Sequence, residues 1–177
     1  MTVVTLVLLA VAALAPALGL RRGTPVWLVA GLAVTALAGA ALAATATPAV
    51  RGVALGATLV LTSAAAVTGG APAVLASFRI ARRQPDAGPV PSSPAGPESP
   101  PGPLRGGRVI GLLERAAVAA AILSGWPEGI AVVLAVKGLA RYPELREPQA
   151  SEQFIIGTFT SVLWAVAVCG VGRGLLT

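Results

Sequence analysis

Charged residues are scarce in this chain, where Asp, Glu, Lys and Arg make up 11% of 177 positions. Soluble domains average about 25% charged residues. Hydrophobic residues account for 55%, and the mean hydropathy is +0.82. So few charges cannot cover a surface that faces water. The composition therefore predicts that lipid is the main solvent of this protein.

Histidine is absent, and Cys169 is the one cysteine. A lone cysteine forms no intrachain disulfide, and one thiol without an imidazole builds no tetrahedral zinc, haem or iron–sulfur site. The sequence also lacks a G-x-S-x-G nucleophile motif and a G-x-x-x-x-G-K-[ST] nucleotide loop. We therefore expect no cofactor, no metal and no catalytic residues.

Long uncharged runs dominate the rest of the sequence and cover residues 2–20, 24–50, 52–78 and 116–127. A helix rises ~1.5 Å per residue, so about 20 apolar residues cross the ~30 Å hydrocarbon layer. The runs lack the alternation of barrel strands, which favours helices. We predict an all-α, polytopic transmembrane helical bundle of about six spans. The first run lacks a preceding basic region, so we interpret it as a retained helix rather than a secretory signal.

The six expected helices cover residues 2–20, 25–47, 50–67 or beyond, 108–124, 128–142 and 152–173. The third weakens at Gly69, Gly70 and Pro72, so residues 73–83 continue either as a kinked end or as a separate turn of helix. Residues 84–107 hold eight of the fifteen prolines and predict a solvated, polyproline-like linker. The linker divides the chain into membrane halves 1–83 and 108–177.

Basic residues are distributed unequally over the two sides of the predicted bundle. Ten fall on the linker side: Arg21, Arg22, Arg79, Arg82, Arg83, Arg105, Arg108, Lys137, Arg141 and Arg146. Arg51 and Arg173 fall on the other. Basic loops stay cytoplasmic, so we expect a cytoplasmic linker and both termini outside. This rule explains the net charge of +6 better than nucleic-acid binding does. Twelve arginines against one lysine suggest a GC-rich bacterial genome, hence a bacterial plasma membrane.

Ionisable side chains concentrate in the last three predicted helices and form a candidate polar cluster: Arg108, Glu114, Arg115, Lys137, Arg141, Glu144 and Glu152. With a hairpin tip at Trp126, Glu114 lies twelve residues before the tip and Lys137 eleven after it. At 1.5 Å per residue, their depths differ by only ~1.5 Å. A buried charge needs a partner. We therefore predict that Glu114 pairs with Lys137 or with Arg141, one turn further on.

Arg108 and Glu144 are each eighteen residues from the tip and are predicted to lie close together. Two interpretations of the whole cluster stay open. The structural one is an ion-pair network that locks three helices together. The functional one is a site for an anionic lipid headgroup, a small anion or a partner protein. The sequence favours the structural interpretation.

Three segments between residues 107 and 161 carry a family resemblance: GRVIGLLERAAVAAAILSG, GIAVVLAVKGLARYPEL and SEQFIIGTFTS. They resemble the C-terminal membrane region of a bacterial family that typically shows G-R-x-I-G-x-L-E-R, then I-G-F-x-x-A-A-K-S-x-x-R-F-x-E-L, then A-E-Y-x-I-I-G-T-x-x-S. Some members of that family carry an N-terminal domain of unknown function. The chain departs from that pattern at Gly138, Tyr142, Ser151 and Phe154. It also lacks the His and Asp motif of longer members. The resemblance implies a polytopic membrane protein and no particular reaction.

The leading functional hypothesis is a non-enzymatic membrane scaffold, regulator or partner-binding subunit. Its expected partners are the lipid bilayer, anionic lipid headgroups or another membrane protein, and not nucleic acid. The alternative is a small-solute or ion channel or transporter. The first three helices lack a mid-membrane Asp or Glu, which weakens coupled transport. An intramembrane enzyme is third. A channel predicts a water-lined path between helices, whereas a scaffold predicts a dry bundle with one exposed small-residue face.

Overall fold

The computed structural model describes residues 1–19, 23–83 and 107–177, and every regular element within them is helical. The elements are α1 (Thr2–Leu18), α2 (Val26–Thr45), α3 (Val53–Ala81), α4 (Gly107–Leu123), α5 (Gly129–Ala140), the 3₁₀ turn η1 (Glu144–Arg146) and α6 (Pro148–Leu176). The all-α prediction is confirmed for this part of the chain. The predicted linker lies outside the described residues except for Gly107, which opens α4. Arg21, Arg22 and Arg105 lie outside them as well.

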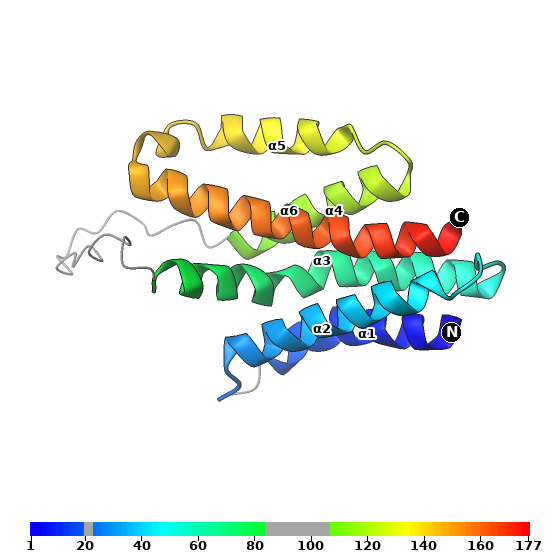
Figure 1. Ribbon diagram of the computed structural model, residues 1–177. Coiled ribbons are helices and arrows are strands. Elements are labelled where there is room, and N and C mark those ends of the chain that lie inside the picture. Colours follow the sequence, from blue (N-terminus) through cyan, green and yellow to red (C-terminus); the bar gives the residue numbers. More distant parts are fainter. Residues whose placement is uncertain (20–22, 84–106) are drawn as a thin grey trace.

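Successive helices run in alternating directions, and both termini lie at the same end of the bundle (Figure 1). The most extensive packing joins α3 and α6, which lie side by side. Helices α1 and α2 pack against α3, and α4 packs against both α3 and α6. Helix α5 packs on α4 at the edge of the bundle. The two predicted membrane halves therefore form one bundle through the α3–α6 interface.

Three helices are long and apolar enough to cross a membrane: α2 with 20 residues, α3 with 29, and residues 150–176 of α6 with 27. Helices α1 and α5 are apolar but have only 17 and 12 residues. At 1.5 Å per residue, α5 is about 18 Å long, less than the ~30 Å hydrocarbon layer. Helix α5 is also slightly shorter at both ends than the helix predicted for residues 128–142.

Helix α3 passes without a break through Gly69, Gly70 and Pro72 and ends at Ala81. Of the two outcomes left open for residues 73–83, the structure shows continuation of the same helix. Proline has no backbone N–H, so Pro72 cannot donate to the carbonyl of Thr68. The helix continues because neighbouring helices pack on both sides of this point, where Gly69, Gly70 and Pro72 are all buried.

The glycine pair is explained by the close approach of other helices. A Cβ atom at Gly69 would lie 2.5 Å from Cζ2 of Trp164 in α6 and 2.9 Å from the carbonyl oxygen of Ala12 in α1. A Cβ at Gly70 would lie 2.9 Å from Cδ of Arg115 in α4. Real Cβ contacts are longer than this. Only glycine therefore lets α1, α4 and α6 meet α3 at this level.

Alanine makes up much of the core, beside larger buried side chains such as Leu9 and Leu175, and many large apolar side chains face outward. The fully or nearly fully buried residues include Ala12, Ala15, Ala33, Ala36, Ala40, Ala65, Ala66, Ala119 and Ala165. The exposed residues include Leu14, Trp27, Leu42, Val60, Leu139 and Phe159. Small residues allow close helix approach in lipid, where an outward apolar side chain carries no penalty. This distribution fits a bundle whose surroundings are hydrocarbon.

Candidate functional site

The central contact of the predicted polar cluster is an ion pair between Glu114 of α4 and Lys137 of α5. Lys137 Nζ lies 2.5 Å from Glu114 Oε2, and the two side chains are 20% and 15% exposed, respectively. Lys137 Nζ also lies 5.6 Å from the centre of the Phe154 ring of α6, within cation–π range. The pairing predicted from the distances to Trp126 is confirmed. One lysine thus connects α5 to both α4 and α6.

Arg115 lies elsewhere, which corrects its assignment to this cluster. Its side chain is buried, at 5% exposure. Nε donates to the carbonyl of Val67 in α3 at 2.7 Å, and Nη1 donates to the hydroxyl of Ser161 in α6 at 3.2 Å. Adjacent helical residues do not share a face. Glu114 therefore faces α5, while Arg115 joins α4 to α3 and α6.

Further polar contacts lie at the same level of the bundle. Trp164 Nε1 donates to the carbonyl of Ala65 at 3.0 Å, and the Thr68 hydroxyl donates to the carbonyl of Ala13 at 2.7 Å. With Arg115, these bonds connect α3 to α1, α4 and α6. The sequence analysis did not predict these contacts between helices. The Gly69–Gly70 pair within an uncharged run could have indicated them, because glycines inside a helix usually mark a close approach of another element.

The structure describes the side chains of two other predicted cluster members, Arg141 and Glu152. Arg141 follows α5 and, like Lys137, lines a cavity between the end of α5 and the start of α6. Glu152 is exposed on α6 and forms no ion pair with another described residue. The side chains of Arg108 and Glu144 lie outside the described part of the structure. Their pairing stays a prediction.

The cavity, here called the Arg141 cavity, has a volume of about 340 Å³. Its lining includes Lys137, Arg141, Gln153, Phe154, Gly157 and Thr158. Thr158 is 4% exposed, and its buried hydroxyl has no hydrogen-bond partner among the described residues. The lining thus combines two cations, an amide, an aromatic ring and an unsatisfied hydroxyl.

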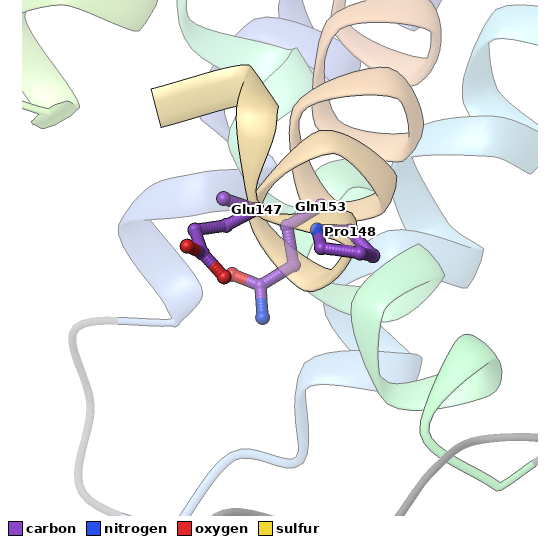
Figure 2. A pocket seen from close by; sticks show the side chains of 4 residues that line it. Glu147, Pro148 and Gln153 are labelled. Carbon is purple, nitrogen blue, oxygen red and sulfur yellow. The ribbon is translucent and has the colours of Figure 1, made fainter. Parts of the chain in front are cut away.

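A second, wider hollow of about 560 Å³ adjoins this cavity at the N-terminus of α6. Glu147, Pro148, Ala150 and Gln153 line it, and the last two also line the Arg141 cavity. Figure 2 shows Glu147 and Gln153 near one another, beside Pro148. The shared residues place this hollow next to the Arg141 cavity.

No protein-family model, curated protein or solved structure matched the chain. The family resemblance carried by residues 107–161 stays a prediction.

Proposed function

We propose that this chain is a non-enzymatic, multi-pass protein of the bacterial plasma membrane that acts as a scaffold or partner-binding subunit. The observation that carries the proposal is the dry centre of the bundle. Between α3 and α6 the buried side chains are predominantly small or apolar, among them Ala65, Ala66, Ala165 and Val168 at 0% exposure. Such a core holds helices together and offers no aqueous route between them.

The buried polar groups at this level support the same proposal. Arg115 and Trp164 direct their donors to backbone carbonyls and to Ser161 within the bundle. A channel needs polar groups that face a continuous water-filled path. The two cavities described above lie near the α6 N-terminus, away from this level. The side chains of Arg115, Ser161 and Trp164 therefore join helices and do not line a pore.

We further propose that all six helices contribute to the membrane bundle. Their alternating directions support this proposal, because successive crossings of one layer must alternate (Figure 1). Val132, Val136 and Leu139 on α5 are exposed, as lipid-facing side chains would be. Local thinning of the bilayer and extended flanking lysine and arginine side chains accommodate a short helix. Arg141 follows α5 directly and suits this role.

A flux assay separates the scaffold from the channel or transporter. The purified chain would be reconstituted in proteoliposomes loaded with a potassium-sensitive or chloride-sensitive dye. We expect flux equal to that of protein-free liposomes. The contrary result is flux that the Arg115→Met variant abolishes and the Arg79→Gln variant retains. Arg79 is a matched control because it is an exposed arginine in the last turn of α3.

The partner-binding role has its own test. A photoreactive amino acid would replace Leu139 on α5 or, separately, Leu42 on α2, since both side chains are highly exposed. We expect one of these faces to yield a cross-linked membrane protein of defined mass in cells, and the other only lipid adducts. Lipid adducts from both positions would argue against a partner at either face.

A further inference from the structure

We propose that the Arg141 cavity binds a phosphate group, carried either by an anionic lipid headgroup or by a free phosphate ion. The cavity lies between the end of α5 and the start of α6, with Lys137, Arg141, Gln153 and Thr158 in its lining. Its volume of about 340 Å³ accommodates a phosphate group together with part of a glycerol unit. The lining supplies N–H and O–H donors from two elements.

The hydroxyl of Thr158 is the first argument for a missing acceptor. It is buried in a residue that is 4% exposed and has no partner among the described groups. Other hydroxyls on α6 do have partners: Ser161 accepts from Arg115, and Thr160 donates to Ser77. Buried polar groups are normally hydrogen-bonded, and each exception needs an explanation. In this structure the hydroxyl has less than 1 Å² of accessible surface, so a ligand oxygen in the cavity would satisfy Thr158 once its side chain rotates toward the cavity.

The two cations supply the second argument. Lys137 and Arg141 are four residues apart, so they lie one turn from each other along the end of α5. The Glu114 carboxylate holds the Lys137 ammonium, which has three N–H donors and uses one in this pair. A guanidinium has five donors in a planar fork that matches phosphate oxygens, so Arg141 can serve a protein acceptor and a phosphate together.

The charge distribution around the cavity favours an anion. Among the described residues that line it, two are cations and none is a carboxylate. Glu147 lines the adjoining hollow, and Glu114 is engaged by Lys137. The end of α3 brings further positive charge, because Arg82 and Arg83 are exposed there. Phe78 of α3 lies against Gly157 of α6, which places this basic segment beside the cavity.

The lipid form of the ligand rests on the membrane location proposed above, whereas the free phosphate form does not. Under the predicted orientation, the cavity lies at the cytoplasmic headgroup level. The hollow lined by Glu147 and Gln153 adjoins the cavity at the same level (Figure 2). A headgroup phosphate and a free phosphate present the same oxygen atoms to Arg141, Lys137 and Thr158.

Two binding measurements on the full chain in mild detergent test the proposal. Native mass spectrometry would count bound phosphatidylglycerol, phosphatidic acid or phosphatidylcholine, and calorimetry would follow inorganic phosphate. We expect Arg141→Gln and Thr158→Val each to weaken binding of the preferred species by about tenfold, the effect of losing a strong hydrogen bond to a charged group. Arg141→Lys should retain an intermediate affinity because it keeps the charge and loses the fork.

Thr62→Val and Arg79→Gln are the matched controls. Thr62 carries another buried hydroxyl without a partner, but it does not line the Arg141 cavity. Arg79 is a basic residue at the same end of the bundle and is also absent from the lining. Both variants should bind like the unmodified chain. If Arg79→Gln weakens binding as much as Arg141→Gln does, the attraction is general surface charge and the proposed site is wrong.

The remaining outcomes also decide the question. If the chain selectively retains phosphatidylglycerol or phosphatidic acid, and inorganic phosphate does not displace the lipid at any concentration, the ligand is a headgroup. Phosphate binding without lipid preference identifies a free anion. If Thr158→Val and Arg141→Lys bind the lipid or the phosphate as tightly as the control Thr62→Val does, the proposed site is wrong. If liposomes show ion flux while cavity binding persists, the scaffold proposal alone fails.

Discussion

Glu114 and Arg115 are adjacent in sequence, but their side chains contact different helices: Glu114 contacts α5, and Arg115 contacts α3 and α6. Counting residues from Trp126 sufficed to predict that Glu114 and Lys137 lie at the same depth, because a helical hairpin converts sequence distance into height. The count carries no information on rotation about the helix axis relative to α3 and α6. Burial of Arg115 depends on that rotation and on space beside Gly70. Such long-range packing could not be predicted from local spacing.

The Glu114–Lys137 pair is expected to stabilise the contact between α4 and α5. Glu114→Gln and Lys137→Gln should each lower the free energy of unfolding by about 1–3 kcal/mol, below the fully buried value because both side chains are partly exposed. The double variant should lose less than the sum, since the two groups interact. Thermal or denaturant unfolding in detergent measures all three. Strict additivity would show that the pair contributes no coupling energy.

At the scale of single elements, the apolar runs and the glycine, proline and arginine residues between them predicted most helix ends to within a few residues. Helix α1 starts at Thr2 as expected, whereas α6 starts at Pro148, four residues before the predicted Glu152. Proline suits the first turn of a helix, and that signal was overlooked. The possible break in α3 rested on the low helix propensity of glycine and proline. Packing against α1, α4 and α6 overrides that propensity.

Gly69 should tolerate no side chain, because α1 and α6 both approach it. We expect Gly69→Ala to destabilise the fold by about 1–3 kcal/mol, since a methyl group would meet the Trp164 ring and the Ala12 carbonyl. Gly31→Ala on α2 is the matched control, because nothing lies within 4 Å of its added Cβ. There the change should be neutral or stabilising by up to about 1 kcal/mol. Equal effects at the two positions would contradict the close α3–α6 packing.

A second prediction for the same interface concerns the indole of Trp164. Its Nε1–H donates to the Ala65 carbonyl, and its ring covers Gly69. Trp164→Phe keeps most of the apolar contact and removes the donor, so it should cost about 1 kcal/mol for the bond, with a further loss for the smaller ring. Trp27→Phe on the exposed face of α2 should leave unfolding unchanged. A comparable loss at Trp27 would point to detergent contacts instead.

For the whole molecule, the sequence predicted alternating helices but not how the two halves meet. The α3–α6 interface joins residues far apart in the chain, and no local pattern encodes such a partner choice. The described basic residues do follow the predicted separation. Arg79, Arg82, Arg83, Lys137, Arg141 and Arg146 belong to the end of α3 and the α5–α6 connection, whereas Arg51 and Arg173 belong to the end with both termini. Charge asymmetry and helix direction are therefore consistent throughout the described bundle.

This asymmetry predicts the orientation of the protein in its membrane. Single cysteines would be introduced as Pro143→Cys or Thr177→Cys in a Cys169→Ala background, since both positions are exposed and lie at opposite ends of α6. An impermeant maleimide should label Thr177→Cys in intact spheroplasts and Pro143→Cys only after permeabilisation, because basic segments remain cytoplasmic. The reverse pattern would invert the topology. Labelling of both cysteines in intact spheroplasts would mean that α6 does not cross the membrane, and the six-span arrangement would then fail at its longest apolar helix.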